Sequence, residues 1–157
     1  MANLSGLAPP SHVGIATVDV QALVASLGPL FGLTFVALPR PAIHHDSPRG
    51  PVSPSPAVAW SSEGPLHLEV VETGPGTVYA TDRSTYLHHV GYWSDDLLAD
   101  VTRCEAEGWT VEATVNDEDG RPSSFAYLSR AGDPWIELID SANQPWLYAL
   151  LARSFRV

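Results

Sequence analysis

Two histidines and two glutamates stand at equivalent places in the two halves of this 157-residue chain. The tripeptide His-Val-Gly occurs twice, beginning at His12 and at His89, and each copy opens a strand-like run. Each half later carries a glutamate within a run of apolar residues, Glu69 in the first half and Glu137 in the second. Imidazole and carboxylate donors together suit Zn²⁺, Ni²⁺, Co²⁺, Mn²⁺ or Fe²⁺. We interpret the four residues as ligands of one divalent metal ion, whose identity the donor types leave open.

Alternating and helical patterns predict the elements that carry these residues. Asp19, at the end of the first run, is expected to cap a helix, which Gly28-Pro29 should kink or end early. Residues 39–56 hold six prolines and are expected to form a long surface loop. Strands are expected at about 11–18, 32–36, 57–61, 66–72, 86–93, from 108, 123–130 and 134–140, and helices at about 20–31, 95–107 and 144–153.

The order of elements repeats between the halves. His12 and Glu69 are 57 positions apart, whereas His89 and Glu137 are 48 positions apart. The nine extra residues lie almost wholly in the proline-rich segment of the first half. One β-α-β-β-β unit with a loop insertion therefore accounts for both halves.

These patterns predict an α+β fold in a single domain over residues 1–157. Two βαβββ modules, at about 11–73 and 86–140, would pair to close their apolar faces, followed by a C-terminal helix at about 144–153. Strand alternation puts the glutamate of each module on the face opposite its apolar neighbours, which would pack beneath the helices. A carboxylate on the inner face would be costly unless it is paired or bound to metal.

Two further histidines flank the candidate ligands. His67 shares a strand face with Glu69 and could donate a hydrogen bond to it, which makes it a weak candidate for the substrate site as well. His88 directly precedes His89, so alternation points its side chain to the opposite face. We interpret His88 as a structural residue.

Four other side chains are weak candidates for substrate binding. Trp93 and Tyr127 could line a pocket, although packing in the core or at an interface explains either residue at least as well. His44 and Arg49 lie in the proline-rich segment and could reach an anionic substrate. The tripeptide His-His-Asp that begins at His44 has the residue types of a metal site, but we expect it to be exposed to solvent.

The overall composition excludes several classes of protein. The net charge of −10 argues against nucleic-acid binding, because phosphate contacts need a basic surface. All eight basic residues are arginine, so a lysine Schiff base and a P-loop lysine are excluded. Cys104 is the only cysteine, which excludes an intrachain disulfide. Neither a membrane-spanning run nor a signal peptide is recognisable, so we expect a cytoplasmic protein without a membrane partner.

The chain resembles the vicinal oxygen chelate superfamily, which contains glyoxalases, bleomycin-resistance proteins and dioxygenases. The resemblance implies that the paired βαβββ modules form a curled mixed sheet around a divalent metal held by His12, Glu69, His89 and Glu137. A glutamate at position 69 resembles the isomerase and lyase branch, and within it the sequence looks most like methylmalonyl-CoA epimerase and glyoxalase I-like members. The motifs that carry the resemblance, all within about residues 11–140, are His12 to Ala16, Leu68 to Glu72, His88 to Gly91 and Asp133 to Leu138.

The leading hypothesis is a metal-dependent isomerase or epimerase that removes a proton next to a carbonyl through a metal-stabilised enolate. Glu69 or Glu137 would be the catalytic base, and the substrate would be a small carbonyl compound or acyl thioester. A glyoxalase I-like lyase would use the same site. The alternatives are a non-catalytic small-molecule binding or resistance protein with an aromatic-lined cleft, and an extradiol-type dioxygenase.

We also predict a homodimer with a movable flap. The C-terminal helix carries an apolar stripe of Trp146, Leu147, Leu150 and Leu151, which a chain this short is not expected to cover in full. Residues 39–56 would be the flap over the metal groove, and their prolines would keep them from joining the sheet.

Overall fold

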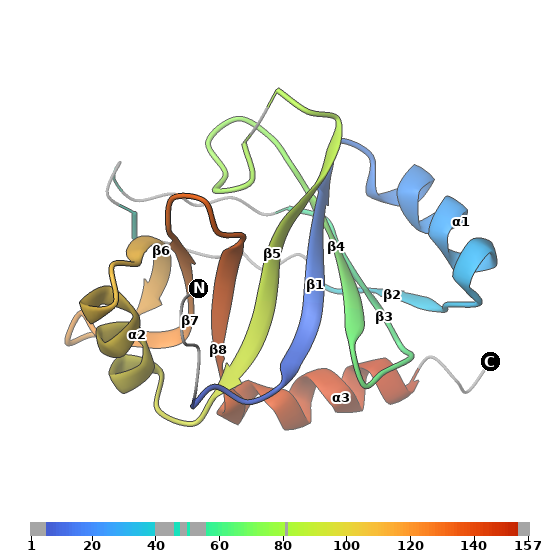
Figure 1. Ribbon diagram of the computed structural model, residues 1–157. Helices are drawn as coiled ribbons and strands as arrows, with labels where there is room; N and C mark the ends of the chain where they lie inside the picture. Colours follow the sequence, from blue (N-terminus) through green and yellow to red (C-terminus); the bar gives the residue numbers. More distant parts are fainter. Residues whose placement is uncertain (1–5, 40–45, 48–49, 51–55, 81, 154–157) are drawn as a thin grey trace.

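A computed structural model describes residues 6–39, 46–47, 50, 56–80 and 82–153 of the chain. It contains one eight-stranded mixed sheet with three α-helices (Figure 1). The first half comprises β1 (Pro10–Thr17), α1 (Val20–Phe31), β2 (Phe35–Ala37), β3 (Val58–Ser61) and β4 (His67–Glu72). The second half comprises β5 (Thr85–Ser94), α2 (Leu97–Ala106), β6 (Thr110–Asn116), β7 (Pro122–Ser129) and β8 (Trp135–Asp140), followed by a short 3₁₀ turn (Ser141–Asn143) and α3 (Gln144–Arg153).

The sheet has the strand order β2-β3-β4-β1-β5-β8-β7-β6. The first strands of the two halves, β1 and β5, pair antiparallel at its centre. Each is flanked by the last strand of its own half in parallel pairing, β4 beside β1 and β8 beside β5. The α+β class and the mixed sheet are therefore confirmed, whereas the sheet is not strongly curled as expected: it remains open, with β2 and β6 as its edge strands.

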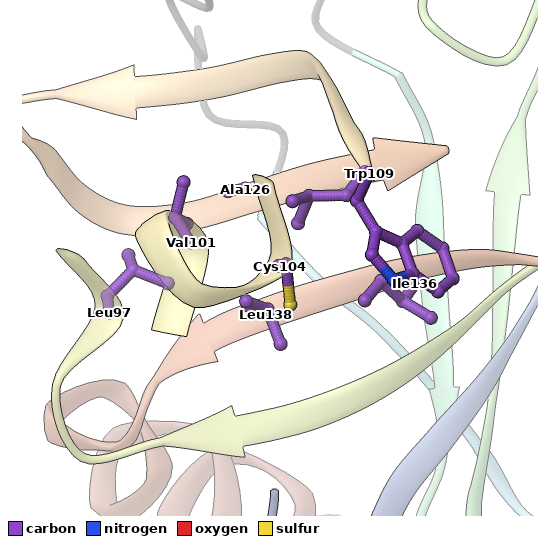
Figure 2. Packing of buried hydrophobic residues seen from close by; sticks show 8 residues of the cluster. Leu97, Val101, Cys104, Trp109, Ala126, Ile136 and Leu138 are labelled. Carbon is purple, nitrogen blue, oxygen red and sulfur yellow. The ribbon is translucent and has the colours of Figure 1, made fainter. Parts of the chain in front are cut away.

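The helix of the second half packs on one face of the sheet and forms the main hydrophobic core. Val101 and Cys104 of α2 lie against Ile136 and Leu138 of β8, and β7 contributes further apolar side chains (Figure 2). Even-numbered residues of β8 point to this face because strand side chains alternate. The prediction that Ile136 and Leu138 pack beneath a helix is thus confirmed, and the opposite face is left for the odd-numbered Glu137.

The helix of the first half has the predicted bounds and a confirmed cap. The Asp19 carboxylate accepts a hydrogen bond from the Ala22 amide, an arrangement that contributes about 1 kcal/mol to helix stability. Gly28-Pro29 does not end the helix early: α1 continues to Phe31 and stops at Gly32. Gly32 adopts a left-handed conformation (φ 66°), and its amide donates to the Gly28 carbonyl, which is the usual way for a helix to end.

Helix α3 has the predicted bounds and lies along one end of the central strands (Figure 1). Leu147 and Leu151 are buried against Trp60 of β3, and Trp93 of β5 packs beside them. The chain itself therefore covers these two leucines of the predicted stripe, whereas Trp146, which belongs to the same stripe, is 59% exposed.

The proline-rich segment is described only in part. His44 and Arg49 lie outside the described residues. Asp46 forms an isolated β-bridge with Thr114, and the Asp46 amide donates to the Thr114 carbonyl at 2.9 Å. Asp46 thus contacts the edge strand β6 through one isolated bridge but belongs to none of the eight strands, and a flap over the metal groove stays a prediction. No helix in the described part of the chain is long and apolar enough to cross a membrane.

Candidate metal centre

The four central strands each supply one of the predicted ligands. Across the sheet, in the order β4-β1-β5-β8, they are Glu69, His12, His89 and Glu137. All four point to the face opposite α2, and all are buried: both histidines are 0% exposed, Glu69 is 7% exposed and Glu137 is 6% exposed. Within each half, parallel pairing of the first and last strands brings the histidine and the glutamate together, although they are 57 and 48 positions apart in the sequence. The pairing of β1 with β5 then joins the two His/Glu pairs.

The donor atoms of these side chains converge. One atom from each residue can be chosen so that all four lie within 4.8 Å of one another. The Nε2 atoms of His12 and His89 are 2.9 Å apart. Oε2 of Glu137 is 3.0 Å from Nε2 of His12, and Oε2 of Glu69 is 3.2 Å from Nε2 of His89. The four candidate ligands therefore form a single cluster.

Two glycines make the convergence possible. Gly14 lies opposite His89 in the sheet, and Gly91 lies opposite His12. A Cβ atom on Gly14 would stand 1.9 Å from the His89 ring, and one on Gly91 would stand 1.8 Å from the His12 ring. Each imidazole therefore lies over the glycine of the other half. Both glycines belong to the two His-Val-Gly tripeptides, but the sequence alone did not reveal that they make room for the histidine rings.

Trp60 holds one carboxylate in place. It lies opposite Glu69 in the β3–β4 pair, and its indole N–H donates to Oε1 of Glu69 at 3.2 Å. His67 was expected as the donor to Glu69, but its Nδ1 lies 2.8 Å from the Ser61 carbonyl instead. The Trp60 contact could not be found from the sequence because it depends on the register between two strands.

His88 does not point away from the site. Its Nδ1 is 2.9 Å from Nδ1 of His89, and its ring contacts those of Tyr79 and Trp135. The prediction of an opposite face is wrong because the pairing of β1 with β5 shifts by one residue at this point, which interrupts the alternation. Burial and the neighbouring His89 lower the pKa of His88 to about 3, so its ring is neutral near pH 7.

The two aromatic candidates, Tyr127 and Trp93, belong to different clusters of apolar side chains. Tyr127 faces Glu137 in the β7–β8 pair, and its hydroxyl is 2.8 Å from that of the buried Tyr79. Burial raises the pKa values of Tyr79 and Tyr127 well above their usual range, so both hydroxyls stay protonated. Trp93 packs between β5 and α3, where its ring contacts Tyr148.

The electrostatics of the cluster favour a bound cation. Burial alone would raise the pKa of Glu137, but His12 and His89 hold it well below its usual value. Burial lowers the pKa of His89, yet Glu137 and Glu69 outweigh this effect and raise it to about 9. Oε2 of Glu69 is buried and makes no well-formed hydrogen bond to a described residue. Two buried carboxylates beside two imidazoles fit a divalent cation, which would satisfy this oxygen and both charges.

The fold and the cluster define a class of protein: two β-α-β-β-β halves that meet around a buried His₂Glu₂ cluster. A family profile described as Glyoxalase/Bleomycin resistance protein/Dioxygenase superfamily matches residues 11–127. The chain belongs to this superfamily, as the sequence motifs indicated. No curated protein sequence matches the chain.

Solved structures of similar fold include two epimerases and a synthase. Methylmalonyl-CoA epimerase from Mycobacterium tuberculosis is 17% identical, with a TM-score of 0.60 over 89% of this chain and 92% of that one. A Streptomyces coelicolor methylmalonyl-CoA epimerase in complex with 2-nitronate-propionyl-CoA is 19% identical, with a TM-score of 0.57 over 87% and 99%. A variant of 4-hydroxymandelate synthase from Streptomyces coelicolor is 15% identical, with a TM-score of 0.56 over 85% and 38%. At these identities the likeness shows the fold alone.

The glycine clearance yields a first prediction. Gly91→Ala should weaken the binding of Co²⁺ or Zn²⁺ by about tenfold or more, because the new methyl group displaces the His12 ring. Gly14→Ala should do the same through His89. Titration against a chromogenic chelator measures both effects. Gly74→Ala is the matched control, since a Cβ there meets nothing within 4 Å. Wild-type affinity in both Gly14 and Gly91 variants would contradict the geometry.

A second prediction concerns protons. Because the pKa of His89 is about 9 without metal, this ring is protonated near pH 7, and a metal must displace that proton to reach Nε2. Metal affinity should therefore rise by about tenfold per pH unit from about pH 6 to about pH 8, with release of about one proton. Calorimetry in buffers of different ionisation enthalpy measures the release. An affinity that does not change with pH over this range would contradict the prediction.

Proposed function

We propose that this chain is a divalent-metal-dependent isomerase or epimerase that acts on a carbon next to a carbonyl group. The observation that carries the proposal is the buried cluster of two histidines and two glutamates on the four central strands. In this proposal residues 1–157 act as one domain, and the modules at about 11–73 and 86–140 each supply half of the site.

Within the proposal, each residue of the cluster has a role. His12, Glu69, His89 and Glu137 would hold the cation, which supplies Lewis acidity for a carbonyl oxygen of the substrate when it is bound. A base must then take the neighbouring proton and return it. Glu69 is tethered by the Trp60 indole through Oε1, so Glu137 is the better candidate for this base.

The proposed substrate is a small carbonyl compound or an acyl thioester. The methylmalonyl-CoA epimerases of similar fold support the thioester, and the position of Glu69 within the cluster favours the isomerase and lyase branch over a dioxygenase. A glyoxalase I-like lyase would require the same donors and the same base. The rival from another class is a non-catalytic binding protein, which the aromatic residues beside the cluster, Trp60, Trp93 and Tyr127, would suit.

Exchange of a substrate proton for deuterium tests the proposed reaction. With Co²⁺ or Mn²⁺ in D₂O, the protein should exchange the C2 proton of methylmalonyl-CoA, as followed by NMR. Glu137→Gln should slow exchange by about 10²-fold or more, because an amide cannot accept the proton. Glu118→Gln, in an exposed turn, is the control.

The same assay separates the alternatives. Turnover of a hemithioacetal of methylglyoxal instead of the thioester would transfer the proposal to the lyase. Metal binding without exchange on either substrate would favour the binding protein, and oxygen consumption with a catechol would favour the dioxygenase.

We also propose that the chain forms a homodimer, now through α1. None of the helix's described residues is buried, whereas α2, its counterpart, buries Leu97, Val101 and Cys104. Leu30 and Phe31 are 69% and 62% exposed. Light scattering should give twice the chain mass of 16.8 kDa, and Leu30→Glu with Phe31→Glu should halve it. Leu66→Glu, at another exposed apolar residue, is the control. A wild-type monomer at micromolar concentration would contradict the dimer.

A further inference from the structure

The residue that precedes each histidine of the cluster is the extra residue of a β-bulge. From His12–Gly91 to Gly14–His89 the strands β1 and β5 keep one register, and the register shifts by one residue beyond each end. The shifts leave Ser11 unmatched on β1 and His88 unmatched on β5. Both side chains are buried, and each reaches the ring that follows it. Both halves thus place a buried bulge residue against the histidine ring that follows it, although this residue is serine in the first half and histidine in the second.

The bulge residue on β1 determines which ring nitrogen of His12 carries the proton. Ser11 Oγ donates its only proton to the Gly91 carbonyl at 3.1 Å, because a carbonyl can only accept. The same Oγ lies 3.1 Å from Nδ1 of His12 and must act there as the acceptor. His12 therefore carries its N–H on Nδ1, and its Nε2 is left to face the cluster.

The bulge on β5 does the same for His89. Nε2 of His88 lies 3.4 Å from the Val78 carbonyl, which can only accept, so this ring carries an N–H on Nε2. Nδ1 of His88 is then an acceptor, 2.9 Å from Nδ1 of His89. His89 must donate from Nδ1, which again leaves Nε2 to face the cluster. Contacts with Tyr79 and Trp135, both at 4.9 Å between ring centres, hold the His88 ring in this position.

We infer that Ser11 and His88 are positioning residues that keep the N–H of each cluster histidine on Nδ1 and so aim both Nε2 lone pairs at one metal ion. This inference rests on the metal centre proposed above. Two lone pairs 2.9 Å apart repel each other unless a cation lies between the rings or a proton binds one of them. The hydrogen-bond chains end on backbone carbonyls, which fixes their direction and prepares the cluster for a cation.

The tautomers can be read directly by NMR in the zinc-loaded wild-type protein. Both His12 and His89 should show a protonated Nδ1 and a metal-bound Nε2 in ¹⁵N-correlated spectra. An Nδ1–metal bond or an N–H on Nε2 in either ring would overturn the inference. Absence of zinc binding in the wild type would instead overturn the metal centre itself, and the inference with it.

Substitutions measure how much the positioning matters. His88→Ala and Ser11→Ala should each weaken Zn²⁺ binding by about 10- to 100-fold, as losses of partners behind metal ligands do. His88→Asn and Ser11→Thr keep an acceptor near the same place and should restore most of the affinity. Ser94→Ala is the matched control, because Ser94 is also buried but donates to the Asp100 carboxylate.

The pattern of rescue separates positioning from simple packing. Circular dichroism and thermal unfolding identify any alanine variant that fails to fold, and the Asn and Thr variants then carry the comparison. Zn²⁺ affinities of His88→Ala and Ser11→Ala equal to that of Ser94→Ala would overturn the inference while leaving the metal centre intact. The same holds if folded Asn and Thr variants bind no better than the alanine variants.

Discussion

Two imidazole rings from neighbouring antiparallel strands need space on the same face of the sheet, and the structure depends on how that space is made. Each ring occupies the position that a Cβ atom would take on the strand opposite, and glycine is the only residue that leaves it empty. The clearance is reciprocal: Gly14 of the first half serves His89, and Gly91 of the second half serves His12. Neither half can therefore assemble the cluster alone, which explains why the first strands of the two halves pair at the centre of the sheet.

The elements around β1 and β5 place and support the other members of the cluster. Parallel strands β4 and β8 place the two glutamates on the outer sides of the histidines, and the apolar residues of β8 turn to the opposite face, where α2 covers them. Trp60 and the two bulge residues contact the carboxylate and the imidazoles from behind. Buried carboxylates cost several kcal/mol when they are left uncompensated, so such a cluster favours either protons or a cation.

Much of this arrangement could be predicted from the sequence because it follows from local patterns. Strand alternation predicts the sheet faces of Glu69 and Ile136, and the capping residue Asp19 predicts the start of α1. The repeated tripeptide predicts that His12 and His89 belong to one site. The contacts that were missed depend on register and tertiary packing. A one-residue shift between β1 and β5 turns His88 toward the cluster, and no pattern within β5 reveals it.

Long-range packing explains the other differences. An apolar stripe on the last helix is the same in sequence whether its own chain or a partner covers it, so the burial of Leu147 and Leu151 against Trp60 was not predictable. The bridge between Asp46 and Thr114 joins a loop of the first half to the edge strand of the second, and only the sheet order places them side by side. In each case the decisive contact is distant in sequence.

The same fold occurs in methylmalonyl-CoA epimerases and in 4-hydroxymandelate synthase. The reaction must therefore be inferred from the cluster and not from the fold. We propose that His12, Glu69, His89 and Glu137 of this cluster bind one divalent metal ion. X-ray absorption spectroscopy of the zinc-loaded protein tests it most directly. We expect one zinc per chain, nitrogen and oxygen neighbours at about 2.0–2.2 Å, and outer-shell scattering from two imidazoles. A sulfur neighbour, or scattering from fewer than two imidazoles, would contradict it.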